Sequence, residues 1–331
     1  MEAPISFRSA ARLVDFMRQA DEPGIVTLAA GVPGLDALPF EALERAYTEA
    51  FRTDGAKMFA YQHPSGDRQL RQLLAERLQA RGVANATADA IVTTSGCTQA
   101  LQVMLSILIR PGDVVACEAP GYYGLLELLS EAGARVLPVP VEGVEGINPE
   151  TARELFLRWK PKCLVVCTTL SNPSGATLSP ERRQRLVEVC RETGVRLIED
   201  DIYAELADSG APKPCRAYDD GSVVSFVTSF SKTVSPGSRV GYALPGTPEL
   251  YDAFAARKTQ QDIHSSVVSE VGLRTFIQQG SLDPHLNTLR ERYRERRALA
   301  LRTIEAHFPA GTRTVVPEGG FMLWVELPEA Y

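Results

Sequence analysis

The chain has 331 residues, 44% of them hydrophobic and 23% charged, which is ordinary for a water-soluble globular protein. A net charge of −6 argues against partners such as nucleic acid or a membrane surface, because phosphate groups attract basic patches. No apolar run is long enough to span a membrane, and the first residues lack the apolar core of a secretory signal. We therefore expect a cytoplasmic protein.

Cysteine and histidine usage favours a reducing compartment and no metal. The six cysteines include no CxxC pair, and most of them lie in apolar runs, as reduced cysteines do. The four histidines have no spacing typical of metal ligands.

The N-terminal part of the chain predicts helices around a glycine-rich loop. An amphipathic pattern over 10–20 indicates a short helix, and residues 40–51 indicate another. The segment 61–78 reads as a polar turn that leads into an amphipathic helix. Between them, the loop at 31–39 begins with Gly31 and could admit a ligand close to its backbone, although a plain turn has the same composition.

Residues 91–108 predict a strand, a turn of small residues and a helix. Free backbone N–H groups at such a helix start can bind an anion, so Gly96, Cys97 and Thr98 are candidates to hold a phosphate. The next strand, over 113–120, ends before Tyr122 and Tyr123. Their rings could pack in the core or stack on a flat ligand.

Strands and helices continue to alternate as far as residue 246. Further strands are indicated at 134–141, 163–169, 195–203, 223–228 and 239–246, with helices from Pro149 and from Ser179 to Gly194. This alternation predicts an α/β fold with a mainly parallel sheet covered by helices on both faces. The last part predicts long helices, including 286–304 with solvated arginines, and a strand at 319–328.

Lys232 is the residue around which the chemistry is expected. It follows the strand at 223–228, where partial burial disfavours the ammonium form and frees the amine for Schiff-base chemistry. Ser229, Ser231 and Arg239 could surround an anion beside it. The alternative is a surface lysine in a serine-rich loop.

Three motifs combine at the strand ends: NPSG at 172–175, EDDIY at 199–203 and SFSKTVSPGSRVG at 229–241. Together they resemble the class I/II aminotransferases of the pyridoxal-phosphate (PLP) fold-type I family, closest to the branch of aminoadipate, kynurenine and aromatic aminotransferases. The resemblance extends from the loop at 31–39 to the strand at 319–328. It implies a large PLP-binding domain over 46–274 and a smaller α+β domain from 1–45 and 275–331.

The resemblance also implies roles around the cofactor. Lys232 would hold PLP as an internal aldimine and would shuttle the proton between the substrate Cα and the cofactor. Asp200 would pair with the pyridine nitrogen, while Asp201 would be structural. Tyr203 and Asn172 would hydrogen-bond the ring's phenolic oxygen, and Tyr122, rather than Tyr123, would stack on the ring.

Further residues would hold the phosphate, the substrate and the partner subunit's cofactor. The phosphate-binding candidates are Gly96, Cys97, Thr98, Ser229 and Arg239, with Ser231 in addition. Gly31 and Asn172 would contact the substrate. Tyr61 resembles the tyrosine that reaches the phosphate in the partner subunit, which implies a homodimer with shared active sites.

The function implied is transfer of an amino group from an L-amino acid to a 2-oxo acid. One alternative is the ligand-sensing domain of a MocR-like transcription regulator, although the fold begins too close to Met1 for a helix-turn-helix module. Another is a different PLP-dependent reaction, such as a lyase or decarboxylase reaction. An SxxK nucleophile at 229–232 is disfavoured, because the chain contains neither SDN nor KTG.

The C-terminal end departs from the family pattern. In the family, a segment after the strand at 319–328 carries the arginine that binds the substrate α-carboxylate, whereas this sequence ends at Tyr331. We expect the sequence to be a fragment that lacks this segment.

Overall fold

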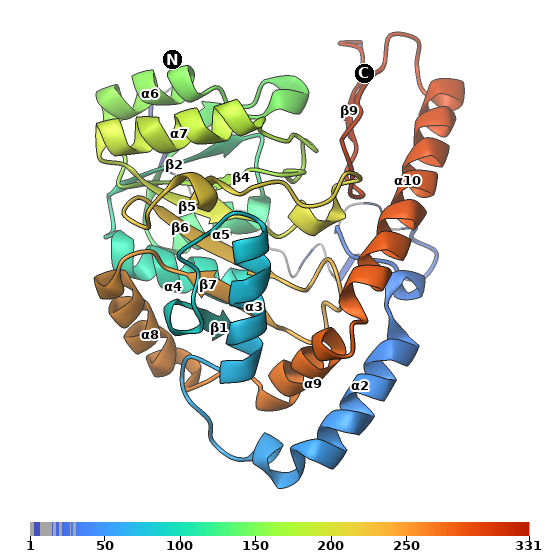
Figure 1. The fold of residues 1–331 in the computed structure, drawn as a ribbon. Helices are drawn as coiled ribbons and strands as arrows, with labels where there is room; N and C mark the ends of the chain where they lie inside the picture. The colour runs from blue at the N-terminus through green and yellow to red at the C-terminus, as the bar shows by residue number, and fades with distance from the viewer. Residues whose placement is uncertain are drawn as a thin grey trace.

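The structure is a computed structural model that describes residues 3–6, 15, 18–19, 22–26, 28 and 31–330. Most of the helix predicted for 10–20 lies outside these residues. Figure 1 shows a central sheet with helices packed around it, and the long helix α10 at one side.

The central sheet has seven strands in the order β1-β7-β6-β5-β4-β2-β3. The pairs β2–β3, β2–β4, β4–β5 and β5–β6 are parallel, and β7 is antiparallel to both of its neighbours. The mainly parallel sheet predicted from the alternating elements is therefore confirmed. The strands are β1 (Val92–Thr94), β2 (Val114–Ala119), β3 (Arg135–Pro140), β4 (Cys163–Cys167), β5 (Arg196–Asp200), β6 (Val224–Ser229) and β7 (Gly241–Leu244).

Helices cover both faces because the buried strands are apolar on both sides. Val115 and Cys117 of β2 pack toward α4 and α5, while Ala116 between them packs toward α6 and α7 (Figure 1). The helices around the sheet are α3 (Arg68–Ala80), α4 (Cys97–Leu108), α5 (Tyr123–Glu131), α6 (Pro149–Trp159), α7 (Pro180–Thr193), α8 (Pro248–Asp262) and α9 (Val267–Gln278).

The ends of α7 illustrate how local sequence sets these elements. Ser179 accepts a hydrogen bond on its hydroxyl from the Arg182 N–H at 3.2 Å, and Pro180 occupies the first helical turn. Gly194 ends the helix with a φ of 70°. The predicted start and stop of this helix are confirmed.

A second layer lies beside the main sheet. It contains α2 (Phe40–Thr53), α10 (Leu282–His307) and a two-stranded antiparallel sheet of β8 (Arg313–Val315) and β9 (Trp324–Glu326). The strand predicted for 319–328 is thus limited to three residues. Short 3₁₀ turns include η1 (Leu35–Ala37), η2 (Gly55–Phe59) and η6 (Cys215–Tyr218).

The prediction that the arginines of α10 form a solvated surface is wrong for Arg297. Its side chain is buried, donates to the Gly320 carbonyl oxygen at 2.8 Å and pairs with the Asp208 carboxylate. A buried guanidinium needs such acceptors, and here they join α10 to the turn before β9.

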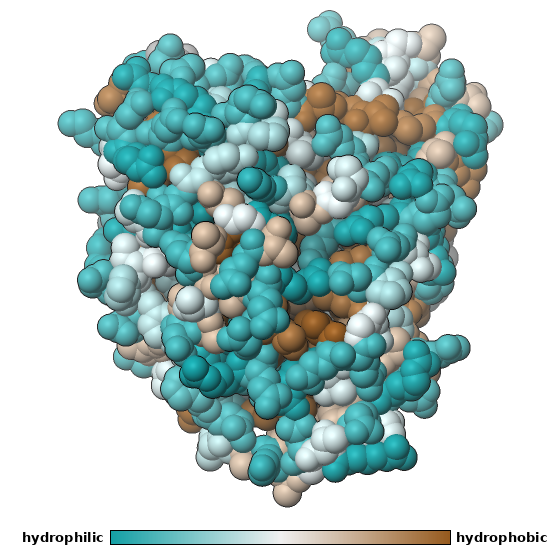
Figure 2. Space-filling view, viewed as in Figure 1, coloured by the Kyte–Doolittle hydropathy of each residue, from teal (hydrophilic) through white to brown (hydrophobic). Residues whose placement is uncertain are grey.

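The surface is mostly hydrophilic on the face drawn in Figure 2, with apolar side chains exposed near α10 and β9. Leu299 of α10 is exposed, as are Val316 and Leu327, which directly follow β8 and β9. Across the described part of the chain, none of the helices combines the length and the apolar character that a bilayer crossing requires.

Candidate active site

The candidate residues converge because five strands end at one edge of the sheet. β2, β4, β5 and β6 are parallel, and β1 has the same direction because β7 is antiparallel to both β1 and β6. The segments after these strands carry Gly96, Tyr122, Asn172 and Lys232, and Asp200 is the last residue of β5. This edge is where open α/β sheets bind their ligands.

Lys232 lies in the turn after β6 and is partly buried. Its Nζ donates a hydrogen bond to the Gly31 carbonyl oxygen at 2.7 Å. Burial lowers the pKa of Lys232 and the charge of Arg239 lowers it further, while the Asp200 carboxylate opposes both effects. The neutral, nucleophilic amine is therefore more accessible than in a solvated lysine.

Gly31 brings the N-terminal loop against the site. Its φ is 57°, and a Cβ at this position would lie 2.8 Å from Met322 Cε and 4.0 Å from Asn172 Nδ2. A larger residue would thus be strained in the backbone and would crowd Met322. The loop of Gly31 therefore lies close to the Asn172 side chain.

Asp200 and Asp201 have different environments. Asp200 Oδ1 accepts hydrogen bonds from the Ile202 N–H at 3.2 Å and from the Cys97 thiol at 3.4 Å. Burial raises the pKa of Asp200 to about 6, although these hydrogen bonds and Lys232 oppose the rise. Asp201 is held by Arg81, with Nη2–Oδ1 at 3.1 Å and Nη1–Oδ2 at 2.5 Å. Of these two acids, Asp200 is therefore the one without a guanidinium partner in the described part of the chain.

Asn172 and Tyr203 form a second polar pair. Asn172 Nδ2 donates to the Tyr203 hydroxyl at 3.4 Å, and the Tyr203 side chain is buried. Tyr122 is the N-cap residue of α5, with its ring against Gly124, where a Cβ would lie 2.4 Å from the Tyr122 hydroxyl. Burial raises the pKa of Tyr122 to about 12, so its hydroxyl stays protonated.

The start of α4 and Arg239 form a site suited to an anion. Gly96 has a φ of 82° and precedes the first helical residue. Arg239 donates from Nη2 to the Ser95 carbonyl oxygen at 3.0 Å and from Nη1 to Ser231 Oγ at 3.2 Å. A Cβ on Gly96 would approach Arg239 Nη2 to 2.4 Å, so the glycine makes room for the guanidinium.

Hydroxyls and N–H groups complete this anion site. Ser229 is buried and its Oγ accepts the Ser231 N–H at 3.4 Å, while Cys97 and Thr98 stand in the first turn of α4. The N–H groups of a first helical turn lack intrahelical acceptors, and the helix dipole adds positive potential there. The arrangement can bind a phosphate dianion.

Tyr61 is placed differently from the other candidates. Its side chain is 82% exposed, and its ring packs edge-on against His264 with 5.6 Å between ring centroids. Within this chain it is available to a neighbouring molecule rather than enclosed in the site.

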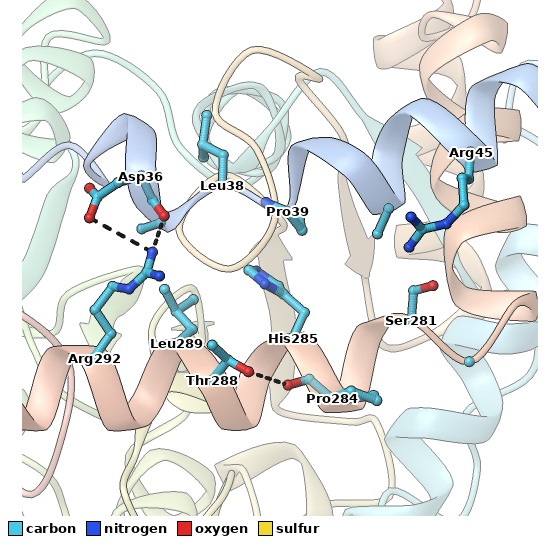
Figure 3. A pocket seen from close by; sticks show the side chains of 13 residues that line it. Asp36, Leu38, Pro39, Arg45, Ser281, Pro284, His285, Thr288, Leu289 and Arg292 are labelled. Atoms are coloured by element: carbon cyan, nitrogen blue, oxygen red, sulfur yellow. Dashed lines mark hydrogen bonds and ion pairs between the residues drawn. The ribbon is translucent and has the colours of Figure 1, made fainter.

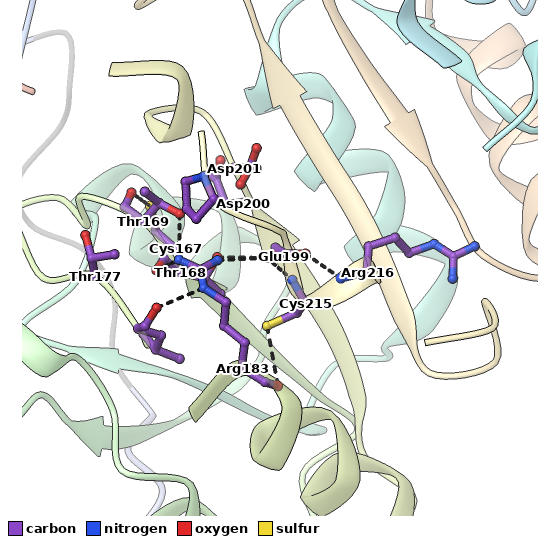
Figure 4. Close-up of polar contacts among 12 residues, drawn as sticks. Cys167, Thr168, Thr169, Thr177, Arg183, Glu199, Asp200, Asp201, Cys215 and Arg216 are labelled. Carbon is purple, nitrogen blue, oxygen red and sulfur yellow. Dashed lines mark hydrogen bonds and ion pairs between the residues drawn. The ribbon is translucent and has the colours of Figure 1, made fainter. Parts of the chain in front are cut away.

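A buried ionic cluster lies next to the ends of β4 and β5 (Figure 4). Glu199 precedes Asp200 and accepts hydrogen bonds from the Thr168 hydroxyl at 2.7 Å and from the Cys215 N–H at 2.7 Å. Arg183 of α7 donates to the Thr168 carbonyl oxygen at 2.8 Å. The cluster joins β5 and α7 to Thr168, which directly follows β4 in the segment that leads to Asn172.

A cavity of about 440 Å³ lies next to the site, between η1, the start of α2 and α10 (Figure 3). His285 lines it and donates from Nε2 to the Thr233 carbonyl oxygen at 2.7 Å, one residue after Lys232. Arg292 lines the same cavity and pairs with Asp36. Lys232 is not among the lining residues, so this cavity borders the Lys232 turn without containing the amine.

Sequence reasoning missed Glu118 and Arg183. Glu118 is a buried acid near the end of β2, and Arg183 is a buried cation on α7. Glu118 had a usable signal, because an acid at the end of the apolar run DVVACEAP is as unusual as Asp200. Arg183 had none, since its helix carries several other arginines.

Comparison with known proteins agrees with this geometry. The profile of aminotransferase class I and II matches residues 23–330. The chain belongs to this family. The resemblance found in the three motifs and the predicted fold class are thereby confirmed.

Individual relatives include both enzymes and regulators. Aromatic-amino-acid aminotransferase 1 of Thermococcus litoralis is 29% identical over 97% of this chain and 78% of its own length. The uncharacterized HTH-type transcriptional regulator YjiR of Escherichia coli is 28% identical over 99% of this chain and 70% of its own length. The structure of LysN, the α-aminoadipate aminotransferase of Thermus thermophilus, complexed with N-(5'-phosphopyridoxyl)-L-leucine, has a TM-score of 0.87 and 27% identity, and the match covers 97% of this chain and 80% of that one.

Aminotransferases of this family use pyridoxal phosphate, and the residues present here fit that cofactor. Arg239 and the start of α4 suit its phosphate, and the Asn172–Tyr203 pair suits its phenolic oxygen. Burial raises the pKa of Asp200 because its charge is incompletely compensated, and a protonated ring nitrogen would supply the missing cation.

Proposed function

We propose that this aminotransferase moves the amino group of an L-amino acid to a 2-oxo acid in two half-reactions that depend on Lys232. The observation that carries the proposal is the convergence of an amine, a carboxylate, an amide–phenol pair and an anion site at one sheet edge. The amine is Lys232, the carboxylate Asp200 and the pair Asn172 with Tyr203. Each group matches one part of the cofactor.

Binding and orientation come from residues around the ring. Arg239, Ser229, Ser231 and the N–H groups of Gly96, Cys97 and Thr98 would hold the phosphate. Asp200 would accept a hydrogen bond from the ring nitrogen and keep it protonated, Asn172 and Tyr203 would hydrogen-bond the phenolic oxygen, and Tyr122 would pack on the ring face. Bound pyridoxal phosphate supplies an electron sink for negative charge at the substrate Cα.

Lys232 has two tasks. Its Nζ would leave the Gly31 carbonyl oxygen and anchor the cofactor covalently, with the cofactor's aldehyde oxygen released as water, and the amine, when free, would take the proton from the substrate Cα. Both tasks need the neutral amine, which the lowered pKa of Lys232 favours. Gly31 and Asn172 would contact the substrate, and their closeness supports this role, because an ideal Cβ on Gly31 would lie 4.0 Å from Asn172 Nδ2.

A single-turnover experiment tests this function. The protein loaded with pyridoxal phosphate is mixed with each of a panel of L-amino acids in the absence of any 2-oxo acid. We expect at least one amino acid to yield one equivalent of its 2-oxo acid per chain, with loss of the cofactor's visible absorption band. Lys232→Ala, the matched control, should yield none and keep its far-ultraviolet circular dichroism.

The regulator relatives support a second candidate, a ligand-sensing domain. YjiR matches 99% of this chain, so the same fold is present in a protein named as a regulator. A sensor would bind an amino acid reversibly and return it unchanged after dialysis. In the single-turnover experiment it would alter the absorption spectrum without forming a 2-oxo acid.

We infer that the working form is a homodimer with shared active sites in the cytoplasm. Phe59 of η2 has an exposed aromatic side chain two positions before Tyr61 in the sequence and favours an interface there. All six cysteines are unbridged, which suits a reducing compartment. Sedimentation equilibrium tests the dimer. In mixed dimers, Lys232→Ala chains should restore turnover to Tyr61→Ala chains only if Tyr61 acts across the interface.

A further inference from the structure

Glu118 is a buried acid that the mechanism above does not use. It is the second-to-last residue of β2 and only 5% exposed. Its Oε1 accepts the N–H of Cys167, the last residue of β4, at 3.1 Å. Its Oε2 is buried and has no hydrogen-bond partner among the described residues. A carboxylate left half-paired in this way is costly, whereas a carboxylic acid can use the same position as a donor.

The hydroxyl of Ser171 lies beside the Glu118 carboxyl group and can accept a hydrogen bond from it. Ser171 is buried, its hydroxyl interacts with Glu118, and within the described residues that hydroxyl has no hydrogen bond of regular geometry. Ser171 directly precedes Asn172, and Cys167 ends the strand that leads to the same turn. As a carboxylic acid, Glu118 would donate from Oε2 to the Ser171 hydroxyl oxygen, and this hydrogen bond would pair both groups.

Glu118 also touches the turn that carries Tyr122. The backbone folds back after β2, so that a Cβ on Gly121 would lie 2.4 Å from the Glu118 carbonyl oxygen and 3.1 Å from its Cγ. Gly121 is followed by Tyr122, the N-cap residue of α5. Glu118 therefore lies between the turn that carries Tyr122 and the segment that leads to Asn172.

We propose that Glu118 is a positioning residue which, as a neutral carboxylic acid, donates from Oε2 to Ser171 Oγ and so fixes the turns of Tyr122 and Asn172 around the cofactor ring. This inference rests on the proposed roles of those two residues. It makes Glu118 a third acid at this sheet edge, distinct from Asp200 in that it holds its own proton and contacts no cofactor atom.

The electrostatic surroundings support the neutral form. Among the described residues, the titratable groups that interact with Glu118 include Cys117 on its own strand, Cys167 on β4 and Asp200 on β5, all of which become negative on ionisation. Burial raises the pKa of Glu118 to about 8, with Asp200 adding to the rise and the Cys167 N–H and Ser171 opposing it. Glu118 thus keeps its proton at neutral pH and loses it in mildly alkaline solution.

The protonation state is tested first on the cofactor-free protein. An infrared difference spectrum between wild type and Glu118→Gln should show the carbonyl band of a protonated carboxylic acid at pH 7, and the band should disappear by about pH 10, well above the pKa of about 8. Absence of the band at pH 7 would overturn the proposal. This reading does not depend on the proposed function, because no cofactor is present.

The positioning role is tested by the affinity for pyridoxal phosphate as a function of pH. Glu118→Leu has no donor, and a buried hydrogen bond worth about 1–3 kcal/mol corresponds to roughly 5- to 150-fold weaker binding at pH 7. Glu118→Gln keeps an N–H donor and should bind as tightly at pH 9 as at pH 7, whereas wild type should weaken over that interval. Binding by Glu118→Leu equal to wild type, or equal weakening of both variants at pH 7, would contradict the role.

Controls separate this inference from the proposed function. If wild type takes up no cofactor at all, the proposed function fails, and the infrared band still decides the state of Glu118. If Glu118→Leu does not fold, the pH profiles of wild type and Glu118→Gln decide the role by themselves.

Discussion

Replacement of Arg183 by methionine should destabilise the protein severely. The Arg183 side chain is 1% exposed and its guanidinium makes four hydrogen bonds of 2.8–2.9 Å, to the Leu178 and Thr168 carbonyl oxygens and to the Thr168 and Thr169 hydroxyls. Its Nη1 lies 3.7 Å from Oε1 of Glu199, whose side chain is fully buried (Figure 4). Methionine has similar length but leaves these acceptors and the Glu199 charge without a cation.

The expected loss in the free energy of unfolding follows from the cost of breaking the buried Arg183–Glu199 ion pair. Removal of one partner from a buried ion pair typically costs about 3–5 kcal/mol, because the remaining charge is uncompensated. Arg185, two residues along the same helix, is the matched control. Its ion pairs with Glu150 and Glu192 are partly exposed, so Arg185→Met should cost less than about 1 kcal/mol.

Urea unfolding of the cofactor-free proteins at pH 7, followed by circular dichroism, measures both losses. Cofactor must be absent, because any ligand of the native state would add to the apparent stability. A loss below about 1 kcal/mol for Arg183→Met, or one equal to that of Arg185→Met, would refute the reasoning. In the double variant with Glu199→Gln, part of the loss should be recovered, since the uncompensated charge is removed.

Three further outcomes are expected. Gly96→Ala should weaken pyridoxal-phosphate binding about tenfold in a fluorescence titration. The new Cβ would lie only 2.4 Å from Arg239 Nη2 and would push the guanidinium out of its position. Unchanged affinity would contradict this expectation. Asp200→Asn removes the carboxylate that opposes the lowering of the Lys232 pKa, so labelling of this amine by an acylating reagent should begin at lower pH than in wild type. In wild type, the free energy of unfolding should fall as pH rises from about 4.5 to 8, because the native state retains a proton on Glu118 that the unfolded state has lost. The free energy of unfolding of Glu118→Gln should fall less over the same pH range. Identical slopes of this free energy against pH in the two proteins would count against the pKa assigned to Glu118.

The order of strands, turns and helices was predictable because it depends on local sequence patterns such as apolar runs and helix caps. The run before Lys232 is apolar and rich in β-branched residues, so the position of Lys232 after a buried strand could be predicted directly. The capping residues Ser179 and Gly194 likewise predict the limits of α7. Lys232, Asp200 and Asn172 could therefore be placed at one sheet edge from the sequence.

Partners distant in the sequence were not predictable. The Lys232–Gly31 hydrogen bond joins residues 201 positions apart, and no local pattern encodes it. Arg297 was misjudged for the same reason, since its acceptors, Asp208 and Gly320, lie outside α10. The domain limits, and the cofactor and substrate roles of individual residues, remain predictions.

The central claim is that Lys232 binds the cofactor covalently. The protein loaded with pyridoxal phosphate is reduced with borohydride, digested, and searched by mass spectrometry for a phosphopyridoxyl group. We predict a single modified peptide with the group on Lys232, and no modified peptide from Lys232→Ala. A modification on another lysine, or equal labelling of Lys232→Ala, would contradict the account.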